Sequence, residues 1–212
     1  MKLSLKSAVA ALVLAAPSAA FAAEYVIDSA HSGAAFRVKH LMVANVNGTF
    51  SNITGTVNYD EKDVTRSTVE ATIDAKTINT NEPKRDEHLR SPDFFDTEKF
   101  PTITFKSTKV EKASENALKV TGNLTLHGVT KPVVLDVEGM GQEVKDPWGN
   151  TKRGATATTK INRKDFGLTW NKALEAGGVT VGDDVKITID LELNKKQPAP
   201  AAAPAAAPAK TK

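Results

Sequence analysis

The chain has 212 residues, with 28 basic and 25 acidic side chains and no cysteine. The length fits one domain with a substantial core, and the lack of cysteine excludes disulfides, thiol nucleophiles and cysteine metal sites. Six basic residues lie in the terminal segments, which leaves 22 of the 28 basic residues against 25 acidic ones, interspersed along the rest of the chain. This pattern excludes the concentrated basic face of a nucleic-acid-binding domain, so we expect no nucleic-acid partner.

Residues 1–22 have the pattern of a cleavable signal peptide. Lys2 and Lys6 precede an apolar run over 8–16, and Ala20-Phe21-Ala22 forms an A-x-A cleavage site. The apolar run is shorter than the ~20 residues that a membrane-spanning helix needs. We therefore expect export and a mature chain that begins at Ala23, with a retained N-terminal anchor as the alternative.

Between residues 23 and 194, apolar and polar residues alternate as in half-buried β-strands. Nine segments show this pattern: 25–28, 34–41, 53–59, 69–73, 102–106, 118–126, 133–137, 155–161 and 185–193. Turn residues separate most of them, at Asn47-Gly48, 60–63, 114–116, His127-Gly128 and 146–150. Eight or nine strands without a long amphipathic helix predict an all-β fold, either an antiparallel barrel or a sandwich. A barrel of about eight strands is filled by side chains or holds one small ligand.

The stretch 81–105 interrupts this alternation. Asn81 can cap a helix, and Pro83 suits its first turn, where a missing N–H costs nothing. Several charged and aromatic side chains follow closely: Arg85, Asp86, His88, Arg90, Phe94, Phe95 and Phe100. We expect a short helical lid over the mouth of a pocket, with a surface helix and its solvated ion pairs as the alternative.

Residues 195–212 consist almost entirely of proline, alanine and lysine. Such a composition has no apolar surface to bury, so we expect a disordered, solvated tail. The folded domain is therefore predicted to span residues 23–194.

Catalytic chemistry has little support in the sequence. No nucleophile motif surrounds any serine, and Asp86 and His88 could orient each other but have no candidate nucleophile beside them. The four histidines form neither H-x-H nor H-E-x-x-H, so a metal site would have to assemble from distant strands. We expect a protein that is not an enzyme and that has no metal and no cofactor.

Candidate ligand contacts come from the predicted inward face and from the aromatic residues. His40 follows Phe36 and Val38 on one face, so it is either a hydrogen-bonded core histidine or a polar group that meets a ligand head. Aromatic rings in or beside irregular segments fit core packing, and they also favour a pocket lining. The residues expected to contact a ligand are Phe36, Val38, His40, Val57, Ile73, Arg85, Asp86, His88, Phe94, Phe95, Phe105, Phe166 and Trp170.

Eight short motifs together resemble the YceI family of exported, lipocalin-like proteins, over residues 24–193. They are Asp28-x-x-His31-Ser32, Phe36-x-Val38-x-His40-Leu41, Gly48-x-Phe50, Arg85-Asp86-x-His88-Leu89-x-Ser91-x-Asp93-Phe94-Phe95-Asp96, Phe100-Pro101-x-Ile103-x-Phe105-x-Ser107, Gly122-x-Leu124-Thr125-x-His127-Gly128-Val129-Thr130-Lys131, Ile161-Asn162-Arg163-x-Asp165-Phe166-Gly167 and Val181-Gly182-Asp183-x-Val185. Each motif is weak alone, but their order and spacing make chance agreement improbable.

The resemblance implies an eight-stranded antiparallel β-barrel with an elongated apolar channel. It also implies binding of a polyisoprenoid lipid, such as an isoprenoid quinone or a polyprenyl carrier, for storage, transport or stress protection. The expected location is the periplasm. The expected partners are a membrane or a membrane cytochrome b, in transient contact, and a second copy of the chain in a homodimer. An enzyme acting on a lipid head group and a structural barrel with a filled core are the alternatives.

Overall fold

The computed structural model describes residues 22–175 and 177–197. The predicted signal peptide and the tail lie outside the described residues, apart from Ala22 and residues 195–197. The elements in chain order are β1 (Ala23–Ile27), β2 (Gly33–His40), β3 (Ala44–Phe50), β4 (Ile53–Tyr59), η1 (Val64–Arg66), β5 (Thr68–Asp74), η2 (Ala75–Thr77), α1 (Pro83–Arg90), β6 (Thr102–Lys112), β7 (Ala117–Leu126), β8 (Val129–Glu138), β9 (Val144–Lys145), β10 (Thr151–Asn162), η3 (Arg163–Phe166) and β11 (Val181–Lys195).

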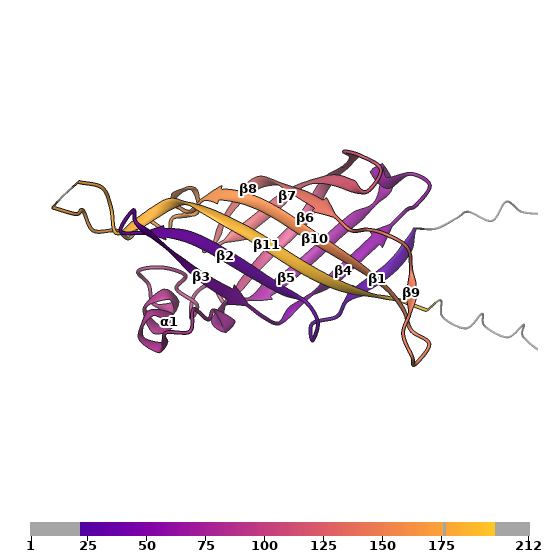
Figure 1. Ribbon diagram of the computed structural model, residues 1–212, viewed down its shortest axis with the longest axis horizontal. Coiled ribbons are helices and arrows are strands. Elements are labelled where there is room, and N and C mark those ends of the chain that lie inside the picture. The colour runs from indigo at the N-terminus through magenta and orange to yellow at the C-terminus, as the bar shows by residue number, and fades with distance from the viewer. Residues whose placement is uncertain (1–21, 176, 198–212) are drawn as a thin grey trace, which may run out of the picture.

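The strands form one antiparallel sheet that closes into a barrel. The described strands pair in the order β3-β2-β11-β1-β4-β5-β6-β7-β8-β10-β9, and a further pairing of β10 with β11 closes a ring of eight. Figure 1 shows α1 and the β2–β3 hairpin at one end of this barrel, and β1 and β9 at the other. We call these the lid end and the β9 end. The predicted all-β barrel with a short helix is confirmed, and the sandwich is excluded.

Strand β11 holds the barrel together because it pairs along both edges. One edge pairs with β10 over residues 184–194. The other edge pairs with β2 over 181–190 and then with β1 over 193–195. This strand runs one residue beyond the predicted boundary, and the Lys196 N–H donates to the Glu24 carbonyl at 2.8 Å. The domain therefore includes the first residues of the predicted tail.

The prediction of a turn at Asn47-Gly48 was wrong, whereas the turn at His127-Gly128 is confirmed. Asn47 and Gly48 lie inside β3, and Gly48 is opposite Phe36 of β2. A Cβ atom at position 48 would lie 2.3 Å from the Phe36 ring. Glycine is thus required there to make room for an aromatic ring on the neighbouring strand, rather than to form a turn.

Helix α1 begins at Pro83, and its N-cap is Glu82, one residue after the predicted cap Asn81. The Glu82 carboxylate accepts hydrogen bonds from the Lys84 and Arg85 N–H groups, which satisfies two donors at the helix start. Pro83 occupies the first turn, as predicted. Asn81 precedes the cap with a φ of 61°, a left-handed conformation that asparagine tolerates. Among the described residues, no helix is long and apolar enough to span a membrane.

A buried arginine closes the β9 end of the barrel. The Arg153 side chain lies over the rings of Tyr25 and Tyr59, at 5.7 and 5.2 Å from their centroids. Its Nε donates to the Tyr25 hydroxyl at 2.8 Å, and its guanidinium forms an ion pair with Glu61. Burial raises the pKa of Tyr25, so this hydroxyl stays protonated at neutral pH and donates to Glu143. The barrel is therefore blocked at this end by a satisfied polar cluster.

Asp28 connects the β1–β2 loop to β10 and β11, and its charge should stabilise the fold in a pH-dependent way. The hydrogen bond from His31, followed by those from Ala30, Asn194 and Lys152, holds the pKa of Asp28 well below its ordinary value of 3.8. A depressed carboxyl pKa contributes stability above the unfolded-state pKa, and this contribution is lost as the pH falls toward the folded-state value.

We predict that Asp28→Asn lowers the thermal midpoint near pH 7. The difference from wild type should shrink as the pH falls below about 4, because the unfolded-state carboxyl is then protonated. Thermal unfolding followed by circular dichroism between neutral and strongly acidic pH checks this. A difference that stays constant over that range would contradict it.

Candidate functional site: an apolar cavity in the barrel

An apolar cavity lies inside the barrel and reaches the lid end. Its volume is about 190 Å³. Apart from Thr104, Thr159 and Arg163, the described residues that line it are all apolar. They are Ala34, Ala35, Phe36, Val38, Phe50, Ile53, Val69, Ala71, Ile73, Leu89, Phe94, Phe95, Ile103, Phe105, Leu124, Leu126, Val133, Leu135, Ala157, Ile161, Leu168, Val181, Val185, Ile187, Ile189 and Leu191.

The cavity exists because two phenylalanine rings lie against glycines in the barrel wall. The Phe36 ring occupies the space left by Gly48, and the Phe105 ring occupies the space left by Gly122 on β7. A Cβ at position 122 would lie 2.4 Å from the Phe105 ring. Both rings can therefore lie along the wall, and the centre of the barrel stays open.

The lid end is covered by apolar side chains that follow from α1. Leu89 of the helix and Phe94 and Phe95 after it line the cavity. The Phe95 ring packs edge-on against Phe50, with centroids 5.5 Å apart, and Phe50 packs against Phe36 at 5.7 Å. An aromatic layer thus separates the cavity from the polar surface of α1.

The polar residues of α1 fix the lid rather than face the cavity. The buried Asp86 carboxylate accepts from the Thr80 N–H at 2.8 Å and from its hydroxyl at 2.6 Å. Arg85 donates to Thr80 Oγ1 and to the Thr80 carbonyl. Arg90 donates to the carbonyls of Lys76 and Ile78. These bonds satisfy the backbone of the loop between η2 and α1 and hold the helix in place.

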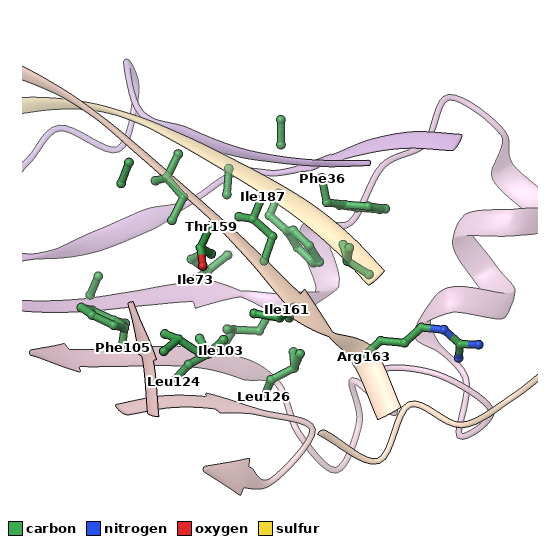
Figure 2. A pocket seen from close by; sticks show the side chains of 18 of the residues that line it. Phe36, Ile73, Ile103, Phe105, Leu124, Leu126, Thr159, Ile161, Arg163 and Ile187 are labelled. Carbon is green, nitrogen blue, oxygen red and sulfur yellow. The ribbon is translucent and has the colours of Figure 1, made fainter. Parts of the chain in front are cut away.

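Arg163 is the charged residue that lines the cavity, and the protein itself saturates it. Its donors bond to the carbonyls of Gly182, Leu168, Trp170 and Val181, and Asp183 Oδ1 lies 3.6 Å from Nη2. Burial lowers the pKa of this arginine, and Asp183 opposes the shift. Figure 2 shows the side chain extending beyond β10, away from the apolar cluster. Arg163 therefore fastens the connection before β11 to the end of the barrel.

The structure places six of the thirteen predicted contact residues in the cavity wall. These six are Phe36, Val38, Ile73, Phe94, Phe95 and Phe105. The wall does not include the other seven, which are His40, Val57, Arg85, Asp86, His88, Phe166 and Trp170. These seven lie elsewhere, and contact with a ligand stays a prediction for all thirteen.

The seven residues outside the cavity wall have other surroundings. Arg85 and Asp86 bond to Thr80, as described above. His88 bonds to Asp93 at 2.8 Å and not to Asp86, so the predicted mutual orientation is absent. Its ring packs against Phe94 and Trp170, both at 5.0 Å between centroids. The remaining three lie in the buried core or at the end of β2: Val57, Phe166 and His40.

Several wall residues were not among the predicted ligand contacts, and many of these lie on β7 and β11. Ile187, Ile189 and Leu191 of β11 face the cavity, as do Leu124 and Leu126 of β7. Their alternation is visible in the sequence, so counting the inward face of every strand would have found them. The role of Arg163 has no such signal, because it depends on carbonyls that come close only in the folded chain.

Asp28, His31 and Glu192 form the group of metal-ligand type found among the described residues. One ligand atom from each lies within 4.8 Å of the others. Lys152 Nζ lies 2.5 Å from Glu192 and 3.3 Å from Asp28, so a lysine ammonium already balances the two carboxylates. This cluster lies outside the cavity wall and is explained by the fold.

We predict that Arg163→Met destabilises the lid end of the barrel. Removing the guanidinium leaves buried carbonyls without donors, each at a cost of about 1–3 kcal/mol. The thermal midpoint should fall by several degrees, and limited proteolysis should cut between η3 and β11. Arg66→Met is the control, because that side chain is 67% exposed and should change stability little. Equal midpoints for both variants would contradict the prediction.

Comparison with known proteins places this geometry in a family. The family model described as a YceI-like domain matches residues 25–193. A UPF0312 protein of Vibrio cholerae is 41% identical over 170 residues, which cover 79% of this chain and 89% of the relative. A UPF0312 protein of Shewanella putrefaciens is 43% identical over 170 residues, with 79% and 88% covered.

Solved structures show the same fold. The Campylobacter jejuni YCEI protein is 34% identical, with a TM-score of 0.63 and coverage of 75% of this chain and 90% of that one. A polyisoprenoid binding domain from Saccharophagus degradans is 16% identical, with a TM-score of 0.59 and coverage of 82% and 99%. The latter likeness concerns the fold alone. The family match, together with the closed barrel and its apolar cavity, shows that this chain belongs to the YceI-like domain family.

Proposed function

We propose that the protein binds the isoprenoid chain of a polyisoprenoid lipid inside the barrel. The observation that carries the proposal is the apolar wall, in which the single charged side chain among the described lining residues is already saturated by backbone carbonyls. Such a wall selects a hydrocarbon chain and disfavours a polar solute, which would lose its hydration without new hydrogen bonds. The fold likeness to a polyisoprenoid binding domain supports the same ligand class.

The energetics favour a long chain. Each buried CH₂ contributes about 0.8 kcal/mol, so ~20 carbons gain on the order of 16 kcal/mol before ordering costs. The volume of about 190 Å³ is small for that purpose, since ligand pockets usually measure roughly 300–1,000 Å³. Binding therefore requires the cavity to widen. The rings of Phe36 and Phe105 and the apolar layer under α1 are the groups that would move.

The polar head would lie at the lid end, because Arg153 and the two tyrosines block the other end. The Thr159 hydroxyl lies among the apolar side chains in Figure 2 and donates to the Val134 carbonyl at 2.8 Å. His40 pairs with the lining residue Val181 at the end of β2. A head group could meet this histidine only at the mouth of the cavity. An isoprenoid quinone and a polyprenyl carrier both fit this arrangement.

The location and the physiological role are further parts of the proposal. The signal-peptide pattern of residues 1–22 supports export, and we infer that binding takes place in the periplasm. Storage, transport and stress protection are all compatible with a binding barrel. Contact with a membrane cytochrome b, homodimer formation and the absence of a cofactor stay predictions.

An enzyme acting on the lipid head group is less well supported than a binding protein. Asp86 and His88, which would have supplied the acid–base pair, bond to Thr80 and Asp93 respectively. The filled barrel is disfavoured by the presence of the cavity. The filled barrel predicts that the purified protein carries no stoichiometric lipid, whereas the enzyme predicts turnover of a lipid that is lost on His88→Ala.

We predict that Gly48→Ala weakens lipid binding by at least about tenfold. The added methyl group would lie 2.3 Å from the Phe36 ring and 2.9 Å from Thr80 Cγ2, so it displaces a ring of the cavity wall and a residue that anchors the lid. Gly33→Ala on the same hairpin is the matched control, since its Cβ would meet only the Phe50 carbonyl oxygen at 3.8 Å. Native mass spectrometry of the protein purified from its own source, followed by lipid extraction, measures occupancy.

The wild type and Gly33→Ala should carry one polyisoprenoid per chain, and Gly48→Ala should be largely empty. Equal occupancy in all three would show that the lipid binds elsewhere. A wild type that carries no lipid and takes none up from detergent solution would contradict the proposed function.

A further inference from the structure

Three consecutive apolar residues lie exposed at the tip of the β2–β3 hairpin. Leu41 is 40% exposed, Met42 51% and Val43 80%. They follow directly after β2 and precede β3, so they form the outermost part of the hairpin. We call these three residues the apolar tip. A hairpin tip in water normally carries polar or turn-forming residues, so exposure to water does not explain three apolar residues here.

Turn geometry does not explain the apolar tip either. Leu41 and Met42 have φ values of 50° and 60°, and the Val43 N–H donates to the His40 carbonyl at 3.2 Å. This is the geometry of a type I′ turn, which asparagine and glycine favour and which costs energy for bulky side chains. The chain thus accepts strain at these two positions, and in return Leu41 and Met42 are only about half buried, with Met42 beside Gly178.

The apolar tip lies beside the mouth of the cavity. His40, which immediately precedes it, pairs with Val181, and Val181 lines the cavity. The Leu41 N–H donates to the Thr180 carbonyl at 2.8 Å, which joins the tip to the segment before β11. Figure 1 shows the tip, this segment and α1 at the same end of the barrel.

A row of basic side chains leads toward the tip on the outer face of the barrel. Lys160, Lys186 and Arg37 are directly opposite one another on β10, β11 and β2. Like charges in such register destabilise a sheet. Lys160 is paired with Asp184 at 2.9 Å, while no ion pair to Arg37, Lys186 or the exposed Lys39 is found within the part of the chain that the structure describes.

The other charges near the tip leave this face basic. Asp183 pairs with Arg163 and Lys164. The exposed Lys172 and Glu175 carry opposite charges, which cancel in the net charge of this face. At about 3.3 Å per residue, Lys39 lies about 7 Å and Arg37 about 13 Å from Leu41 along the strand. These positions reach the head groups of a membrane if the barrel tilts with its tip inserted.

We propose that the apolar tip inserts into the surface of an anionic phospholipid bilayer and thereby brings the mouth of the cavity to the membrane. This inference rests on the proposed lipid binding and adds the surface from which the lipid is taken up. Apolar side chains enter the interface between head groups and acyl chains, and basic residues bind anionic lipids within a Debye length of the surface. The lipid could then move between the bilayer and the cavity of the docked barrel without crossing water.

The β9 end carries a competing exposed side chain and supplies the control. Trp148 is 84% exposed in the turn between β9 and β10. However, the barrel is blocked at that end by Arg153 and its tyrosines. Docking through Trp148 would leave the mouth of the cavity far from the membrane.

The test is flotation of the full chain with vesicles of phosphatidylcholine containing about one third phosphatidylglycerol, compared with phosphatidylcholine alone. The double variant Leu41→Asn, Met42→Gly introduces the residues that a type I′ turn favours. It should therefore keep or raise the thermal midpoint while losing at least about tenfold in vesicle binding, because two apolar side chains no longer insert. Arg37→Gln with Lys186→Gln should weaken binding to the anionic vesicles alone.

The outcomes separate docking from lipid binding. Trp148→Ser should bind vesicles like the wild type, and the double tip variant should still take up a polyisoprenoid from detergent solution. The proposal is overturned if the wild type does not float, if the double tip variant floats as well as the wild type, or if Trp148→Ser abolishes flotation. It is also overturned if the tip variant changes the sedimentation coefficient, since the tip would then contact a second copy. Normal uptake from detergent without flotation leaves the proposed function standing, and flotation without any uptake contradicts only the proposed function.

Discussion

The open space inside the barrel depends on the packing of two phenylalanine rings against two glycines. Phe36 lies over Gly48 and Phe105 lies over Gly122, each pair on neighbouring strands. A Cβ atom at either glycine would overlap the ring, so neither ring could keep its present position. A barrel of eight strands is narrow enough for side chains to fill it. The glycines thus allow both rings to lie in the cavity wall, and the apolar character of the wall follows from the strand alternation.

Two buried arginines define the ends of that cavity. Arg153 closes the β9 end by packing on Tyr25 and Tyr59 and by an ion pair with Glu61. Arg163 lies at the lid end, where its donors fasten the connection that precedes β11. A buried charge is tolerated only when it is paired or fully hydrogen-bonded, and both guanidiniums meet that condition. The asymmetry leaves the lid end as the single direction from which a ligand could enter the cavity described here.

Much of the fold was predictable because alternation is a local property of the sequence. The strand that contains Phe36 and Val38 and the long last strand were both found in this way. The short helix was found where the alternation stops, from a capping residue and Pro83. Turns were less predictable. Asn47-Gly48 has the composition of a turn, but the Phe36 ring on the next strand decides the role of Gly48. The turn at Leu41 and Met42, in contrast, contains none of the residue types that favour turns.

The candidate site was predictable only in its apolar part. Asp86 and His88 appeared to be ligand groups because polar residues on a loop often bind ligands, yet Asp86 satisfies the backbone at Thr80 and His88 packs on Trp170. Thr80 is only six residues from Asp86, but the loop that brings the two together is not visible in the residue types. Trp170 lies far from His88 in the sequence, so local sequence cannot reveal that contact. The same holds for Arg163, whose four carbonyl partners meet only in the folded chain.

The central claim is that the isoprenoid chain, rather than the head group, provides the affinity. Isothermal titration with isoprenoid quinones that share one head group and differ in tail length tests it most directly. We expect the affinity to rise with each added isoprene unit until the cavity is filled, with a negative heat-capacity change that grows in parallel. Affinity that is independent of tail length, or equal binding of the tail-free head group, would contradict the claim.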